Sequence, residues 1–251
     1  MSTYGQFCPL VQATQLLCER WTLIVVRELI AGSTRFNEIK KGVPKMSPSL
    51  LSARLKQLIV AGVIKHGGNK GNYTYSLTPA GLELRPIVEL FGAWGHRWVR
   101  SNLSKIDLDA GLLMWDMRRT VDPAIFPSYR IVVQFEFPDA PIGARVWWLV
   151  SENGEIDLCL DDPGYNIDVV IKCSLKTMTE VWTCQQGFKD AVKKGDIKVM
   201  GDSKLTRKLQ DWLRSSPLSK LGSVGELPKL VWNINPRMAE SVKHRGISTA
   251  G

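Results

Sequence analysis

The feature that most constrains the fold is the segment 46–62, MSPSLLSARLKQLIVAG, which has the marks of a helix with defined ends. Ser47 stands directly before Pro48; serine is a favoured N-cap, and proline is tolerated in the first helical turn. After Gly62, Val63-Ile64 starts a predicted strand. Between these ends the leucines recur at i, i+4 and i+7, which predicts one buried face, formed by Leu51, Leu55 and Leu58.

The opposite face of this helix carries small residues and one lysine. Its members are Ser49, Ser52, Ala53 and Lys56. Side chains of this size and charge allow a helix to approach the major groove of DNA closely. Taken alone, the pattern fits equally well an ordinary amphipathic helix whose outer face is solvated. The segments on either side of the helix favour the first interpretation.

A short hairpin is predicted directly after this helix, over residues 63–77. Its glycines predict turns, and its tyrosines alternate with hydroxyl residues as in a returning strand. No acidic residue occurs between Ile64 and Leu82, and the tip carries Lys70 and Asn72. A cationic tip beside a helix of this kind is typical of a wing that lies on a phosphate backbone.

Helices are predicted on both sides of this unit. Three precede it, over residues 9–19, 21–31 and 35–41, and a long one opens at Thr78-Pro79 with Pro86 as a site for a kink. The last helix carries an apolar seam at spacings of 3 and 4, formed by Leu84, Ile87, Phe91, Trp94 and Trp98. This seam is predicted to be a dimer interface; alternatively, it covers the core of its own domain or the second domain.

The charge is concentrated in the first part of the chain. Residues 1–104 hold 13 Lys/Arg against 5 Asp/Glu, whereas residues 105–251 hold 20 against 19. A basic module joined to a nearly neutral one suggests nucleic-acid binding by the first and a different role for the second.

Several short motifs in this order resemble the HxlR-type winged helix-turn-helix transcriptional regulators over about residues 7–100. They are Cys8-Pro9, Trp21-Thr22-Leu23, Arg27-Glu28-Leu29, Arg35-Phe36-Asn37-Glu38-Ile39, Ser52-x-Arg54-Leu55-x-x-Leu58, Tyr75-Ser76-Leu77-Thr78-Pro79-x-Gly81 and Trp94-Gly95. The resemblance implies a dimeric, sequence-specific DNA-binding regulator, either activator or repressor. The predicted DNA contacts are Arg35, Lys45, Ser47, Ser49, Ser52, Arg54, Lys56, Lys70 and Asn72.

The same resemblance raises a question about one cysteine. Some members of the family sense electrophiles or oxidants through the cysteine that corresponds to Cys8, and thiols near a helix N-terminus are more reactive than others. The alternative is that Cys8 packs in a dimer interface as a small apolar residue.

The second half of the chain is predicted to be an α+β domain. Segments with period-2 alternation near residues 131–137, 146–150, 156–160 and 167–173 predict an antiparallel sheet with one buried face, and helices follow over 175–184, 187–193 and 203–213. Residues 110–215 resemble the sterol-carrier-protein type fold, which implies a cavity for an apolar ligand. The candidate lining residues are Trp115, Phe135, Trp147, Trp148 and Trp182, although the same residues equally suit an ordinary core.

The overall prediction is a winged helix-turn-helix domain over residues 1–104, an α+β domain over 105–235 and a flexible tail over 236–251. No catalytic motif, cofactor or metal site is expected, because the histidines (His66, His96 and His244) fit no zinc pattern and no phosphate-binding or nucleophile motif occurs. The five scattered cysteines fit reduced thiols in a cytoplasm, and neither a signal peptide nor a membrane span is predicted.

Three functions remain open at this point. The favoured one is a dimeric DNA-binding regulator modulated by an apolar effector in the second domain. The first alternative is a lipid carrier whose N-terminal module mainly dimerises. In the second alternative, the C-terminal domain is a structural platform for dimerisation with a filled core.

Overall fold

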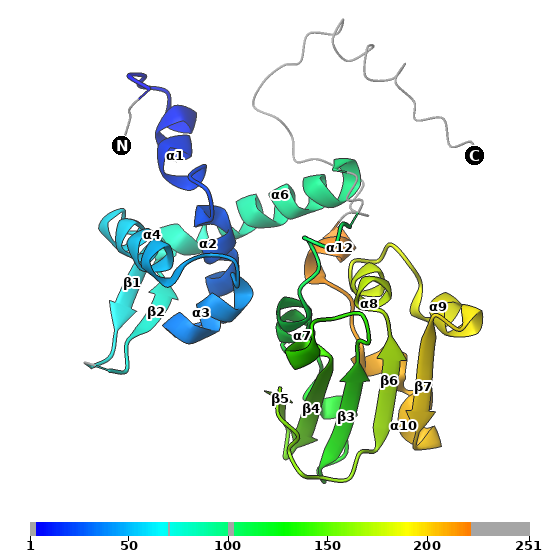
Figure 1. Cartoon of the computed structure of the whole chain (residues 1–251). Helices are drawn as coiled ribbons and strands as arrows, with labels where there is room; N and C mark the ends of the chain where they lie inside the picture. Colours follow the sequence, from blue (N-terminus) through cyan, green and yellow to red (C-terminus); the bar gives the residue numbers. More distant parts are fainter. Residues whose placement is uncertain (1–3, 70, 100–102, 222–251) are drawn as a thin grey trace, which may run out of the picture.

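The computed structural model describes residues 4–69, 71–99 and 103–221, in which the two halves of the chain enclose separate hydrophobic cores (Figure 1). The first half contains mainly helices and one small hairpin. Its elements are α1 (Pro9–Leu17), α2 (Thr22–Ile30), α3 (Phe36–Gly42), α4 (Pro48–Val60), β1 (Ile64–Gly67), β2 (Thr74–Leu77), α5 (Pro79–Leu82) and α6 (Arg85–Trp98).

The core of the first half lies between α2, α3, α4 and the hairpin. Val26 of α2, Ile39 of α3 and Leu51 of α4 are all fully buried in it. The hairpin is fixed to the helices as well, because the Tyr75 backbone N–H donates a hydrogen bond to the Thr34 carbonyl at 2.7 Å. The helices α3 and α4 and the antiparallel β1–β2 pair therefore form a winged helix-turn-helix, as predicted.

The helix expected to open at Thr78-Pro79 is in fact two helices. Thr78 caps the short α5, which ends at Leu82, and α6 begins three residues later. Pro86 explains the break, since proline lacks a backbone N–H and its ring would clash with the carbonyl of the residue four positions earlier, Leu82. In the first turn of a new helix, proline meets neither penalty.

The second half is a five-stranded sheet with helices. Its elements are α7 (Ala110–Arg118), η1 (Pro123–Ile125), β3 (Ile131–Glu136), η2 (Ile142–Ala144), β4 (Val146–Glu152), β5 (Glu155–Cys159), β6 (Val169–Cys173), α8 (Leu175–Trp182), α9 (Phe188–Lys194), β7 (Ile197–Gly201), α10 (Ser203–Arg207), α11 (Leu209–Trp212) and α12 (Pro217–Leu221). The helix predicted over 203–213 is thus interrupted at Lys208.

The strand order is β5-β4-β3-β6-β7, and the prediction of a wholly antiparallel sheet was wrong. β6 runs parallel to β3, with Val133 opposite Val169 and Phe135 opposite Ile171. The reason is the connection after β5, which crosses from one edge of the sheet to the far side of β3. Such a crossover places two strands side by side in the same direction, whereas a tight hairpin cannot.

One face of the sheet is apolar and packs against α7 and α8 (Figure 1), which confirms the predicted burial. Leu209 and Trp212 of α11 belong to the same core. Phe135 is fully buried on that face. The other face is polar: Lys172 pairs with Glu136 at 2.9 Å, and the Trp148 indole N–H donates to the Gln134 side chain at 3.0 Å.

Helix α7 has no counterpart among the elements predicted from the sequence. The side chain of Asp109 caps the helix, accepting a hydrogen bond from the Leu112 N–H at 2.9 Å. Met114 on α7 is fully buried against the sheet. The predicted tail, 236–251, lies outside the described residues.

Candidate nucleic-acid interface

The two faces of α4 differ as the leucine spacing predicted. Ser47 caps the helix by accepting a hydrogen bond from the Leu50 N–H at 3.3 Å. Leu51, Leu55 and Leu58 are at most 1% exposed and hold the helix against the core. The opposite face is exposed, and its residues are Ser49, Ser52, Ala53 and Lys56. We call these four residues the reading face.

Ser47, whose hydroxyl lies 3.2 Å from that of Ser49, is also exposed, as is Arg35 at the N-cap of α3. Lys45, although exposed, donates a hydrogen bond from its Nζ to the carbonyl of Ile106, in the segment that leads to the second half. The structure therefore directs this lysine toward the second half of the chain.

Arg54 is placed differently from the other predicted contacts. It forms an ion pair with Glu19 and donates hydrogen bonds to the Arg20 carbonyl at 3.2 Å and to Gln57 at 2.6 Å. The contacts with Glu19 and Arg20 join α4 to the turn after α1. Its guanidinium is thus engaged within the protein and is not part of the reading face.

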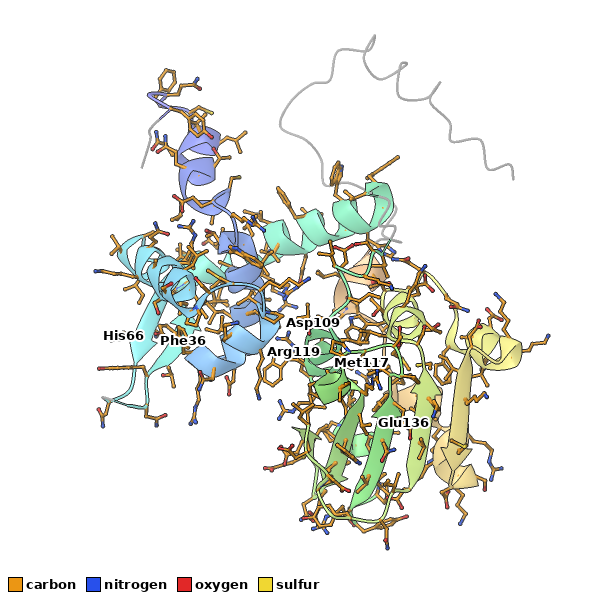
Figure 2. The ribbon with its side chains drawn as sticks, in the orientation of Figure 1. Phe36, His66, Asp109, Met117, Arg119 and Glu136 are labelled. Carbon is orange, nitrogen blue, oxygen red and sulfur yellow. The ribbon has the colours of Figure 1, made fainter. Side chains whose placement is uncertain are left out.

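The wing extends beyond the core beside α4. Asn72 is exposed near its tip, whereas Lys70 lies outside the described residues. The turn requires glycine at position 68, where φ is +87° and a Cβ would lie 2.1 Å from the Asn72 carbonyl oxygen. Lys65 is exposed on β1, and His66 stacks on Tyr73 at 5.3 Å; Figure 2 shows His66 on the wing.

Lys65 was missed in the sequence-based prediction of contacts, although the sequence contains a signal for it. Ile64 is buried, and side chains alternate across a strand, so the next residue must point outward. An outward lysine on a wing adds a phosphate-binding charge.

The start of α3 is fixed by Glu38, whose carboxylate accepts hydrogen bonds from the Thr34 N–H at 2.8 Å and the Arg35 N–H at 3.0 Å. Partial burial raises the pKa of the Glu38 carboxyl, but these hydrogen bonds outweigh it, and the net pKa is below its ordinary value. The charged form of Glu38 therefore stabilises the helix-turn-helix.

Glu38→Ala is expected to reduce the free energy of unfolding by about 1 kcal/mol at neutral pH, because the cap is lost. The native pKa is lowered, so this contribution is complete above the unfolded-state pKa and is lost as the pH falls through the native value. Urea unfolding of both proteins at about pH 7 and about pH 3 measures it. A difference in stability that does not shrink at acid pH would contradict the prediction.

Two helices of the first half leave apolar side chains exposed. In α6 the predicted seam is mostly uncovered: Phe91 and Trp94 are each 61% exposed, whereas Leu84 is half-buried against the core. Helix α1 buries none of its residues. Part of α6 is covered by α12, where Leu218 lies against Gly92.

Cys8 lies at the N-cap position of α1 and is half-buried, with a free thiol. Cys173 has a different environment, because burial and the charge of Asp139 raise its pKa to about 12. Cys173 therefore stays protonated at neutral pH, and of these two thiols Cys8 is the accessible one.

A groove of about 690 Å³ lies in the second half beside α7 and α8. Its apolar lining comprises Met117, Met178, Val181, Trp182, Phe188 and Leu213. Of the five residues predicted to line a cavity, Trp182 lies on this groove. Phe135 and Trp147 are in the core, Trp148 lies on the polar face of the sheet, and Trp115 faces the first half.

Among the described residues, no helix combines the length and apolarity needed to cross a membrane. Within the same ranges, no three His, Cys, Asp or Glu side chains are grouped closely enough to hold a metal ion.

Comparison with known proteins agrees with this geometry. A family model described as HxlR-like helix-turn-helix matches residues 16–103. The chain is 36% identical over 99 residues to YvaP, an uncharacterized HTH-type transcriptional regulator of Bacillus subtilis, covering 38% of this chain and 92% of YvaP.

Two further proteins are similar. The chain is 30% identical over 114 residues to sll1512, an uncharacterized HTH-type transcriptional regulator of Synechocystis, covering 43% of this chain and 82% of sll1512. The reduced form of the transcriptional regulator YodB from B. subtilis is 28% identical, covering 37% of this chain and 95% of that one, with a TM-score of 0.33.

The fold and the relatives define a transcriptional regulator of the helix-turn-helix type, which binds DNA. Within that class, the chain belongs to the HxlR-like helix-turn-helix family. The family model ends at residue 103 and leaves the second half unassigned.

Proposed function

We propose that the protein is a homodimeric regulator of transcription. The reading face of α4 contacts the bases of duplex DNA, and the wing binds the phosphates. The observation that carries this proposal is the reading face itself. It is exposed, small and cationic, and it is backed by three buried leucines that fix its direction. We propose that Arg35, Ser47, Lys70 and Asn72 make further contacts with the DNA.

Salt dependence of DNA binding tests the phosphate contacts. For duplex DNA, the slope of log affinity against log salt becomes steeper by nearly one for each phosphate neutralised. Lys56→Ala is expected to weaken binding to all sequences and to make the slope shallower by about 1. Lys189→Ala, an exposed lysine of α9, is the matched control and leaves the slope unchanged. Equal slopes for all three proteins would contradict the phosphate contact.

The dimer is proposed to form through the exposed sides of α6 and α1. Phe91 and Trp94 are large apolar side chains that are each 61% exposed, and no residue of α1 is fully buried; a second copy would cover such surfaces. Two copies also fit the paired half-sites that helix-turn-helix proteins commonly read.

Trp94→Glu is expected to convert the dimer to a monomer, because the interface would bury an unpaired carboxylate. Light scattering after size exclusion measures the mass, which should fall by half. Ile142→Glu is the control, since Ile142 is 84% exposed in the second half. A wild-type monomer, or a Trp94→Glu dimer, would refute this interface.

We further propose that the groove beside α7 and α8 accepts an apolar effector. Its volume is within the range of small-molecule sites, and its two methionines, Met117 and Met178, adapt readily to different shapes. The sterol-carrier type fold of the second domain and redox sensing by Cys8 stay predictions. The lipid-carrier alternative gains no support, because the sequence relatives reported above are transcriptional regulators.

A further inference from the structure

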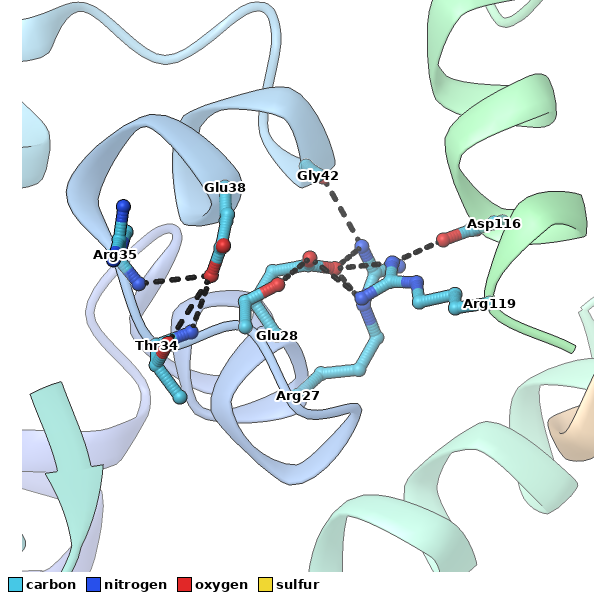
Figure 3. A network of polar contacts seen from close by, with 9 residues as sticks. Arg27, Glu28, Thr34, Arg35, Glu38, Gly42, Asp116 and Arg119 are labelled. Atoms are coloured by element: carbon cyan, nitrogen blue, oxygen red, sulfur yellow. Dashed lines mark hydrogen bonds and ion pairs between the residues drawn. The ribbon is translucent and has the colours of Figure 1, made fainter. Parts of the chain in front are cut away.

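A buried carboxylate lies at the junction of the two halves. Glu28 of α2 is fully buried, and its oxygens accept hydrogen bonds from Arg27 at 2.6 Å and from the Ser33 hydroxyl at 3.3 Å (Figure 3). Both donors belong to the helix-turn-helix domain. A charge this deeply buried must be matched by donors on all sides, or it becomes very costly.

The remaining donors come from the second half of the chain. Arg119, at the end of α7, donates from Nη1 to one Glu28 oxygen at 3.0 Å and from Nη2 to the other at 3.1 Å. This two-point geometry holds the guanidinium plane and the carboxylate in a fixed orientation. Asp116, one turn earlier, pairs with the same guanidinium. In Figure 2, Arg119 lies on the side of α7 that faces the first half.

The same carboxylate is packed against the end of α3. A Cβ at Gly42 would lie 2.0 Å from the Glu28 carboxyl carbon, so glycine is needed there. Arg27 also donates to the Gly42 carbonyl at 3.1 Å. Next to it, Lys41 of α3 lies 4.9 Å from the ring centre of Trp115 on α7. Glu28 thus connects α2, α3 and α7.

The two carboxylate neighbours of Arg119 favour the charged form of its guanidinium. Burial lowers the pKa of the Arg119 guanidinium, but Glu28 and Asp116 outweigh it and leave the pKa above its ordinary value. Arg119 is only 15% exposed at its side chain, so solvent screens the pair weakly.

We propose that Arg119 is a positioning residue for DNA reading, which acts from the second domain through Glu28 to fix α3, and with it the reading face of α4. This inference rests on the proposed function. The second domain is an addition to the family's module, because a 99-residue match already takes up 92% of YvaP. Arg119 is the residue of this added domain that binds the buried Glu28 carboxylate of the helix-turn-helix.

A double-mutant cycle on DNA affinity tests the inference, with Arg119→Gln, Glu28→Gln and the double variant. The DNA is a duplex selected by the wild-type protein. If Arg119 acts through Glu28, each single variant binds about tenfold more weakly, which is about 1.4 kcal/mol, and the double variant binds no more weakly than the weaker single variant. Independent effects that simply add would overturn the inference, as would wild-type affinity in Arg119→Gln.

Two more variants separate positioning from general damage. Arg118→Gln is the matched control. The Arg118 guanidinium donates a hydrogen bond to the Ile156 carbonyl at 2.9 Å, within the second domain, so this variant should keep the wild-type DNA affinity. Arg119→Lys keeps the positive charge but loses the two-point hydrogen bonding of the guanidinium. Its DNA affinity should therefore lie between that of the wild type and that of Arg119→Gln. If Arg119→Gln fails to fold, Arg119→Lys takes its place in the test. Wild-type DNA affinity in Arg119→Lys would then overturn the inference.

The failure of this inference can be told apart from failure of the proposed function. If the wild-type protein selects no duplex, the proposed function itself has failed. If the wild type selects a duplex and the cycle shows no coupling, DNA reading stands and only the role of Arg119 is refuted.

Discussion

Ser52→Glu is expected to weaken DNA binding at least a hundredfold while leaving the fold intact. Ser52 is exposed at the centre of the reading face, so the new carboxylate would face the phosphates and base edges. Like charges brought together in an interface cost several kcal/mol, and about 2.8 kcal/mol is already a hundredfold. Fluorescence anisotropy with a duplex selected by the wild type measures the loss.

The control for this variant is Ser203→Glu, at an exposed position on α10 far along the chain. It adds the same charge to the protein, and its DNA affinity should stay within a fewfold of wild type. If Ser52→Glu and Ser203→Glu lower the affinity equally, net charge explains the loss and α4 is not the reading helix.

Leu55→Ala is expected to reduce the free energy of unfolding by about 2–5 kcal/mol, because it leaves a cavity where a leucine packs. Leu55 is 1% exposed and lies in the core between α4 and its neighbours. Val60→Ala, on the same helix, is the matched control. Because Val60 is 81% exposed, this variant should lose little of the free energy of unfolding. Denaturant unfolding of both variants gives the two values.

Opposite effects are expected from the variants at Ser52 and Leu55, the two residues chosen from α4. Ser52→Glu removes binding and keeps stability, whereas Leu55→Ala lowers stability through the core. Equal loss of stability in Leu55→Ala and Val60→Ala would contradict the placement of the buried face. Together the variants test which side of the helix meets DNA and which side meets the protein.

Local patterns were enough to predict the helix-turn-helix, the wing and the buried face of the sheet. Capping by Ser47, the leucine spacing and the alternation around Tyr75 each depend on residues close together in the sequence. The resemblance to the HxlR-type regulators, stated from ordered motifs, agrees with the family model over residues 16–103.

The errors came from features that depend on context. Predicting the break before α6 required weighing Pro86 against a continuing apolar pattern. Predicting α7 required recognising Asp109 as its N-cap. The parallel pairing of β3 and β6 is set by a crossover that no alternation pattern reveals. None of these changes the identity of the reading helix.

The junction at Glu28 could not be predicted from sequence at all. Arg119 lies 91 residues after its partner, and nothing local distinguishes it from the adjacent Arg118. Lys45 and Arg54 show the same limit, because their positive charges suggested DNA contacts while the fold directs them to Ile106 and Glu19.

Selection from a random pool of duplexes tests the central claim most directly. The purified protein is mixed with the pool, and the bound DNA is amplified and sequenced over several rounds. The proposed function predicts a shared motif with two half-sites about one helical turn apart, read by two copies of α4. A pool that stays random after selection would contradict the claim that this chain reads DNA sequence.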